Sequence, residues 1–85
     1  MLSIGIKGSR TVSVTESNTA RALGSGTLDV FATPAMIALI EATASTSVAP
    51  FLDEGSSTVG THLDVAHSAA TSVGMDVTCE TELVE

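Results

Sequence analysis

The stretch that most constrains this chain runs from Phe31 to Ala42 and has the features of a buried helix. The Thr33 hydroxyl can cap a helix N-terminus, and Pro34 suits the first helical position because its missing N–H is not needed there. The residues that follow are apolar or strong helix formers, and no glycine or proline interrupts them before Pro50. Because the run is apolar nearly all round, we expect a helix that is covered by other elements.

Glu41 is the one residue that does not fit this apolar run. A carboxylate in a buried helix must be solvated, paired or used in chemistry, because burying it alone is unfavourable. An exposed position on one side of the helix and a functional position are both compatible with the sequence. Serine and threonine accumulate between Thr43 and Val48, so we expect the helix to end there, ahead of Pro50.

Size and charge narrow the classes of protein that this chain can belong to. With 85 residues we treat 1–85 as a single domain, and the net charge of −7 argues against nucleic acid and anionic membrane surfaces as partners. No apolar run reaches the roughly 18 residues of a membrane span, and residues 1–7 lack the pattern of a signal peptide. The single cysteine, Cys79, gives no intrachain disulfide and no cysteine-based zinc site, which suits a cytoplasmic location.

Three segments, 11–15, 58–67 and 75–83, alternate in the manner of β-strands. A short helical turn is expected at 18–23, ended by the glycines that follow. The predicted order is therefore strand, helix, strand, strand, and a short loop between the last two strands favours an antiparallel sheet. A sheet that packs around a buried helix gives an α+β fold.

Polar residues in the segment 58–67 raise the question of a site. The alternation places His67 on the inner face and His62 on the outer face, so the two histidines and Asp64 do not converge, and we expect no metal site. His67 is then either a satisfied strand-end histidine or a functional one. Gly60 indicates a bulge or a close backbone approach, for which a bound ligand is one cause.

Several short motifs of the chain, taken together, resemble the hot-dog fold thioesterases of the fluoroacetyl-CoA thioesterase-like family. They extend from about Val14 to Val84 and are Thr19-Ala20, Leu23-Gly24-Ser25-Gly26, Ala32-Thr33-Pro34-Ala35-Met36, Glu41, Gly55, Thr58-Val59-Gly60-Thr61, Leu63-Asp64-Val65, His67 and Val73-Gly74-Met75. The resemblance implies a long central helix wrapped by an antiparallel sheet. It also implies a homodimer whose protomers pair through their sheets, with active sites near the interface.

The same resemblance implies an acyl-CoA thioesterase that hydrolyses a short-chain acyl-CoA to the free acid and CoA, without a metal or redox cofactor. Thr33, Glu41 and His67 take the positions of the family's catalytic residues, and Gly60 that of a substrate-binding backbone. A desolvated Glu41 would have a raised pKa and would act either as base on water or as nucleophile on the acyl carbon. His67 would pass a proton to the leaving thiolate, and the helix N–H groups would stabilise the oxyanion.

The chain departs from the family pattern in two places. It stops at Glu85, inside an expected hairpin, so we expect a sheet that lacks the family's C-terminal strands. The segment 24–28, ahead of the helix, has no aromatic lid residue, so we expect a general short acyl group rather than fluoroacetyl. The alternatives are a non-catalytic module that binds acyl-CoA or another small acyl ligand, a truncated inactive relative, and a purely structural dimer.

Overall fold

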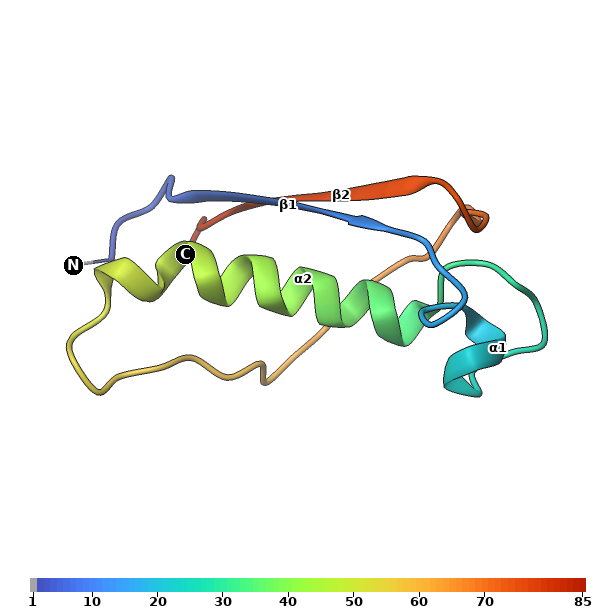
Figure 1. Ribbon diagram of the computed structural model, residues 1–85. Helices are drawn as coiled ribbons and strands as arrows, with labels where there is room; N and C mark the ends of the chain where they lie inside the picture. The colour runs from blue at the N-terminus through green and yellow to red at the C-terminus, as the bar shows by residue number, and fades with distance from the viewer. Residues whose placement is uncertain (1) are drawn as a thin grey trace.

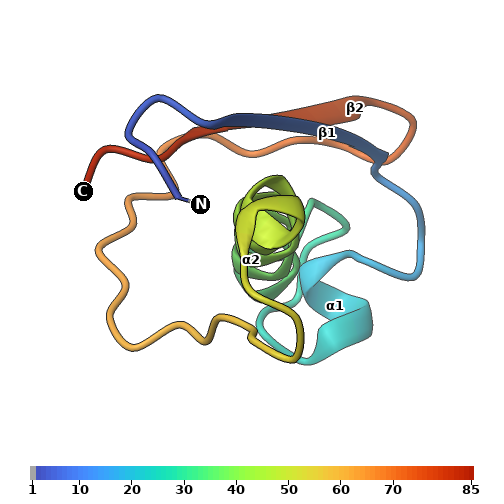
Figure 2. The same ribbon diagram turned by 90° about the vertical axis from the view of Figure 1, so that its left-hand side faces the viewer.

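The molecule consists mainly of one long helix that packs under a small sheet (Figure 1). The computed structural model describes residues 2–85. Its elements, in chain order, are β1 (Lys7–Ser13), α1 (Ala20–Leu23), α2 (Thr33–Val48), the 3-10 turn η1 (Ala49–Phe51) and β2 (Asp76–Glu82). β1 and β2 form a two-stranded antiparallel sheet that lies along α2, and α1 lies near the N-terminal end of α2 (Figures 1 and 2).

The start of α2 differs in one detail from the sequence prediction. Thr33 is the first helical residue and Pro34 follows it, while Ala32 occupies the capping position and makes no side-chain capping bond. The prediction that the Thr33 hydroxyl caps the helix was therefore wrong, because that hydroxyl bonds to His67 instead. The helix ends at Val48, within the predicted range.

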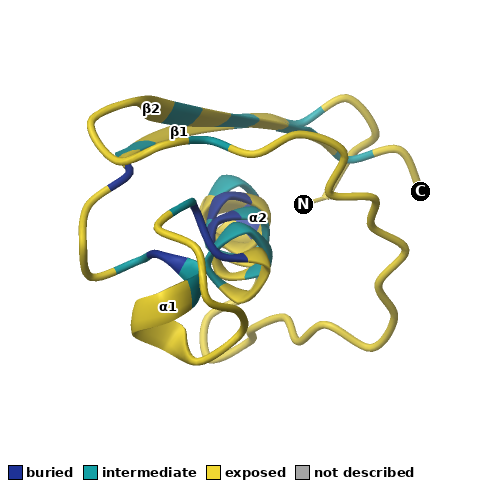
Figure 3. Ribbon diagram, turned by 90° about the vertical axis from the view of Figure 1, so that its right-hand side faces the viewer, coloured by how far each residue is buried: buried dark blue, intermediate teal, exposed yellow. Residues whose placement is uncertain are grey.

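Only one face of α2 is covered. Leu39, Thr43 and Val48 are its buried residues. The buried Thr43 hydroxyl donates a hydrogen bond to the Leu39 carbonyl oxygen at 2.7 Å. Ala38 and Glu41 are exposed, and Figure 3 shows exposed residues along the other face. The expectation of a helix buried all round was therefore wrong, because the sheet reaches only one side.

The sheet has an apolar inner face and a polar outer face, as the alternation in β2 predicted. Leu39 belongs to a small core with Val14 and Phe31, against which the inward residues Val77 and Cys79 pack. On the outer face, hydrogen-bonded or ion-paired side chains face each other across the strands: Thr11 with Thr78 at 2.8 Å, Ser13 with Asp76 at 2.9 Å, and Lys7 with Glu82 at 3.9 Å. Such cross-strand pairs stabilise the antiparallel ladder. The first strand lies at 7–13, earlier than predicted.

Residues 58–67 do not form the predicted strand. The segment has no regular structure, and α2 lies between it and the sheet in the view of Figure 1. The sheet of residues 2–85 consists of β1 and β2 alone, so this segment has no strand to pair with. Its apolar side chains stay in solvent, with Val59 83% and Leu63 50% exposed. Alternation gives a segment two faces, but only a partner strand turns it into part of a sheet.

No helix in residues 2–85 has both the length and the apolar character that a membrane crossing requires.

Candidate active site

Thr33 and His67 meet at the N-terminal end of α2. Their Oγ1 and Nδ1 atoms are 2.7 Å apart, and the imidazole tautomer decides which one donates. Both residues are exposed, so the pair is open to a ligand from solvent. Both line one pocket with a cavity volume of about 280 Å³. Pro34 has no N–H and the Met36 N–H donates to the Ala32 carbonyl oxygen at 2.9 Å, so in the first turn of α2 the N–H groups of Thr33 and Ala35 are left without a partner within the helix. They carry a partial positive charge toward an anion.

Backbone contacts far apart in the sequence explain how His67 reaches the helix. The Phe31 N–H donates to the Thr71 carbonyl oxygen at 2.8 Å, and Val30 forms an isolated antiparallel bridge with Ser72. These contacts fix the chain after His67 against the residues that precede α2. The histidine, four residues before Thr71, is thereby held beside the first turn of the helix.

Glu41 and Gly60 form a second pair, farther along α2. A Cβ placed on Gly60 would lie 2.9 Å from the Glu41 Oε2 atom, so only a glycine leaves room for this carboxylate as it stands. Both residues line a hollow with a cavity volume of about 520 Å³. Gly60 lies outside any strand, so it forms no bulge, and the group that approaches it is the Glu41 side chain.

The two pairs remain separate within one chain. Thr33 and Glu41 are eight residues apart, which corresponds to about 12 Å along a helix. Among residues 2–85, no side-chain hydrogen bond or ion pair joins Glu41 to Thr33 or to His67. Glu41 is also exposed, so the expectation of a desolvated carboxylate was wrong for the single chain: the sheet covers the opposite side of the helix.

The histidines and acidic residues do not gather elsewhere. Within the described part of the chain, no three His, Cys, Asp or Glu side chains converge in the way that a metal ion would require. Cys79 is half-buried on the inner face of β2.

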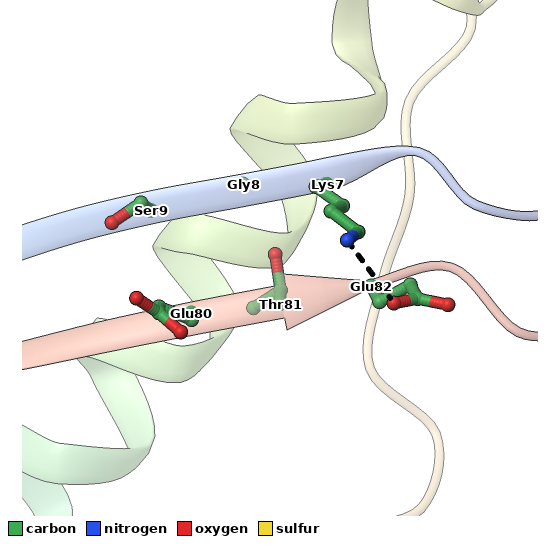
Figure 4. Close-up of a pocket in the computed structure, with 6 residues that line it drawn as sticks. All are labelled: Lys7, Gly8, Ser9, Glu80, Thr81 and Glu82. Carbon is green, nitrogen blue, oxygen red and sulfur yellow. Dashed lines mark ion pairs between the residues drawn. The ribbon is translucent and has the colours of Figure 1, made fainter.

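A separate hollow on the sheet holds none of the predicted site residues. Its cavity volume is about 570 Å³, and it is lined by residues 7–9 of β1 and 80–82 of β2 (Figure 4). Figure 4 shows Lys7 directed toward Glu82, and the Nζ–Oε1 distance is 3.9 Å. Ser9 lies opposite Glu80 in the ladder, but no side-chain hydrogen bond joins the two, so this hollow offers less chemistry than the hydrogen-bonded Thr33–His67 pair.

Sequence reasoning missed one group of contacts, which tie α1 to the loop ahead of α2. Arg21 on α1 binds the loop that follows it: its Nε and Nη2 atoms donate to the Thr27 carbonyl oxygen at 3.3 and 3.1 Å. The Nε atom also lies 3.2 Å from the Asp29 Oδ1 atom. No motif marks this arrangement, and the one available signal was that the chain has only three Lys and Arg residues.

Comparisons with known proteins point to one family. The profile of the family described as FlK, fluoroacetyl-CoA-specific thioesterase, matches residues 14–85. A curated relative, the fluoroacetyl-CoA thioesterase of Streptantibioticus cattleyicolor, is 42% identical over 55 residues. That match covers 65% of this chain and 40% of the relative, which is less than half of the relative's length.

Solved structures of similar proteins agree in fold. A mutant of the fluoroacetyl-CoA-specific thioesterase FlK, in complex with fluoroacetate and CoA, superposes with a TM-score of 0.90 at 31% identity. A second structure, of the fluoroacetyl-CoA thioesterase FlK, gives a TM-score of 0.91 at 31% identity. The chain covers 72% and 67% of these two chains. The predicted α+β hot-dog architecture, a central helix with an antiparallel sheet, is confirmed by these matches.

Proposed function

The chain belongs to the fluoroacetyl-CoA-specific thioesterase family, and from this premise we propose that it hydrolyses a short-chain acyl-CoA thioester to the free acid and CoA. The observation that carries the proposal is the 2.7 Å contact between Thr33 Oγ1 and His67 Nδ1 at the start of α2, beside an open pocket. Thr33, Glu41 and His67 are the proposed catalytic residues, and the Gly60 backbone is the proposed substrate contact. The CoA thioester is the substrate, and no metal or redox cofactor takes part.

The Thr33–His67 contact suggests how the leaving group is protonated. When the Thr33 hydroxyl donates to Nδ1, the neutral imidazole carries its proton on Nε2. Uptake of a second proton from solvent at Nδ1 makes the ring a cation, and Nδ1 then donates to the Thr33 oxygen. The Nε2 proton of this cation can pass to the thiolate sulfur of CoA as the carbon–sulfur bond breaks, which returns the imidazole to its neutral form. The oxyanion that forms on the acyl carbon is stabilised when it lies before the free N–H groups of the α2 N-terminus.

Glu41 supplies the other half of the chemistry by one of two routes. As a general base it takes a proton from the water that attacks the acyl carbon. As a nucleophile it attacks the acyl carbon itself and forms an anhydride, which water then hydrolyses to the acid. In the general-base route the water oxygen ends in the product carboxylate. In the nucleophilic route it ends there or in Glu41, according to which carbonyl of the anhydride the water attacks. In both routes the thiolate leaves and takes up a proton.

We also propose a cytoplasmic homodimer that pairs through its sheets, with the active sites near the interface. The exposed position of all three residues leaves them accessible to a second protomer.

Thiol release from a panel of short acyl-CoA thioesters tests the proposal, measured at known oligomeric state for wild type, Glu41→Gln and the control Glu54→Gln. Removing a general base lowers the rate by about 10²–10⁴-fold, so Glu41→Gln should be nearly inactive. Glu54 is an exposed residue in a turn, and its replacement should leave the rate unchanged. Acyl-CoA binding should survive in Glu41→Gln, because the amide keeps the shape of the carboxyl group.

Each other outcome has a definite meaning. Equal thiol release by wild type and Glu41→Gln would place the chemistry elsewhere. Binding without release by the wild type would indicate a non-catalytic acyl-CoA module. If the folded protein neither binds acyl-CoA nor releases thiol, both the thioesterase and the non-catalytic acyl-CoA module are ruled out.

A further inference from the structure

Asn18 lies in the turn between β1 and α1 and is held by both ends of its side-chain amide. The Thr15 N–H donates to the Asn18 Oδ1 atom at 2.9 Å, and the Asn18 Nδ2 atom donates to the Ser13 carbonyl oxygen at 3.0 Å. One partner is a donor and the other an acceptor, so only one orientation of the amide satisfies both. The Asn18 N–H also donates to the Thr15 carbonyl oxygen at 3.2 Å. Asn18 is therefore fixed against the end of β1.

The backbone of Asn18 extends this anchor to the residue that precedes α2. The Ala32 N–H donates to the Asn18 carbonyl oxygen at 3.0 Å, and the Ala32 oxygen accepts from the Met36 N–H at 2.9 Å. Ala32 is fully buried at the capping position of the helix, and both of its backbone polar groups are thus paired. The chain that follows β1 accordingly runs from the sheet to the N-terminal end of α2 (Figure 1).

The position of Ala32 sets the direction of the Thr33 N–H. In a planar trans peptide unit the C=O and N–H groups point in opposite directions. The Ala32 oxygen points along the helix toward the Met36 N–H, so the Thr33 N–H of the same peptide unit points away from the helix, ahead of its first turn. This N–H is one of the two first-turn groups that remain for an oxyanion.

The Thr33 hydroxyl depends on the same anchor. It lies 2.7 Å from the His67 Nδ1 atom. Residues 30–32 bond on one side to residues 18–20 and on the other side to residues 71–72, which follow the histidine. The two members of the pair are therefore placed from opposite sides of one short segment. A shift of that segment on the first side moves the threonine relative to the histidine.

We propose that Asn18 is a positioning residue of the candidate active site. Its amide fixes the turn after β1, its carbonyl oxygen holds Ala32, and Ala32 sets the place of the Thr33 N–H and hydroxyl. Asn18 does not line the pocket that contains Thr33 and His67, so it acts through the backbone and not on the acyl group. The effect on rate rests on the proposed function, whereas the Thr33–His67 geometry is measurable without any substrate.

Steady-state thiol release tests the effect on rate, with the short acyl-CoA that the wild type hydrolyses fastest. Asn18→Ala removes both side-chain bonds, so kcat should fall about tenfold through a displacement of less than about 1 Å, while KM should stay within about twofold. Asn18→Asp keeps the Oδ1 acceptor and loses only the Nδ2 donor, so kcat should fall less, by about threefold. The matched control Ser13→Ala removes a hydroxyl bond to Asp76 but keeps the carbonyl that Asn18 uses, and should leave kcat unchanged.

A measurement on the free protein separates positioning from a general loss of structure. The ¹⁵N chemical shift of a neutral imidazole nitrogen changes when that nitrogen accepts a hydrogen bond. At a pH of about 8.5, where an ordinary histidine is neutral, His67 Nδ1 should therefore differ from His62 Nδ1, which has no side-chain partner within the described part of the chain. Asn18→Ala should reduce this difference by at least about half, and Ser13→Ala should preserve it. Thr33→Val, which lacks the hydroxyl, gives the limit of no contact.

The outcomes separate this inference from the proposed function. If the folded wild type releases no thiol, the thioesterase function fails, and the His67 shift alone decides the role of Asn18. If folded Asn18→Ala keeps kcat and the shift difference, or changes only KM with the shift difference intact, the positioning role is overturned. Equal shifts of His62 and His67 in the wild type would remove the Thr33 contact on which the role depends. If thermal melts show that Asn18→Ala does not fold, Asn18→Asp carries both measurements.

Discussion

The two sides of α2 differ in almost every respect. On the sheet side, Leu39 packs against Val14 and the inward residues of β1 and β2, and the helix approaches β1 closely at Gly8. On the opposite side the segment 58–67 runs along the helix with all of its residues exposed, as the yellow outer loop in Figure 3 shows. The sheet side holds the fold together, whereas the other side carries the residues proposed for chemistry.

This contrast shows what an alternating sequence pattern can specify. β2 and the segment 58–67 both alternate apolar and polar residues. β2 is paired in register with β1, so that Val77 lies opposite Val12 and both face the helix. The segment 58–67 has the same kind of pattern but no partner strand within residues 2–85, and Val59 stays 83% exposed. The pattern determines which face would be buried, and the partner determines whether it is.

Amide hydrogen exchange should show the largest difference between the two sides. Amides in the paired stretch of β1 and β2 open only when the sheet opens, whereas amides of residues 58–67 have no ladder to protect them. We expect the paired amides to exchange at least about 100-fold more slowly, measured residue by residue by NMR. Comparable protection of residues 58–67 would show that this segment is paired in solution, for instance across a dimer.

Removing a leucine from each side gives the next largest contrast. Leu39 is 6% exposed, so Leu39→Ala should lower the free energy of unfolding by about 2–4 kcal/mol through lost burial and a cavity. Leu63 is 50% exposed, and Leu63→Ala should change it by less than about 0.5 kcal/mol. Urea unfolding followed by circular dichroism measures both. A large loss in Leu63→Ala would mean that this side is packed in the assembled protein.

The sequence allowed much of the sheet side to be predicted, because local rules operate there. The helix start at Thr33 and Pro34 and the alternation of β2 depend on backbone preferences and on a nearby apolar core. The prediction that Thr33 caps the helix failed because its hydroxyl forms a hydrogen bond with His67, which lies 34 positions away in the sequence. A contact at such a separation leaves no periodic trace in the sequence.

The candidate site was only partly predictable for the same reason. The resemblance singled out Thr33, Glu41, Gly60 and His67, and the structure shows how they are distributed, as one pair at the helix start and another two turns along. The hydrogen bonds from Arg21 to Thr27 could not be predicted from the sequence, because the acceptor is a backbone oxygen and any residue at position 27 would supply it. The solvation of Glu41 depends on what covers the second side of α2, and composition does not determine this.

The smallest predicted effect uses two glycines that face α2 from opposite sides. Neither Gly8 nor Gly60 has a positive φ, so alanine is compatible with both backbones and only the contacts differ. At Gly8 a Cβ would lie 2.7 Å from the Ser47 Cβ atom and 3.2 Å from a backbone oxygen of α2. Neither atom can move away by a side-chain rotation. Gly8→Ala must therefore push the helix from the sheet and should lower the free energy of unfolding by about 1–3 kcal/mol.

At Gly60 the obstacle is the far end of a flexible side chain, the Glu41 carboxylate at 2.9 Å. Gly60→Ala should therefore displace that carboxylate and leave the free energy of unfolding within about 0.5 kcal/mol of wild type. If Glu41 acts in thioester hydrolysis, a displacement of about 1 Å should reduce thiol release by one to two orders of magnitude. Urea unfolding should show the larger loss of stability in Gly8→Ala, and thiol release should show the loss of rate in Gly60→Ala. A loss of stability in Gly60→Ala equal to that in Gly8→Ala would mean that both sides of α2 are packed alike, because only a rigid neighbour converts an added methyl group into lost folding energy.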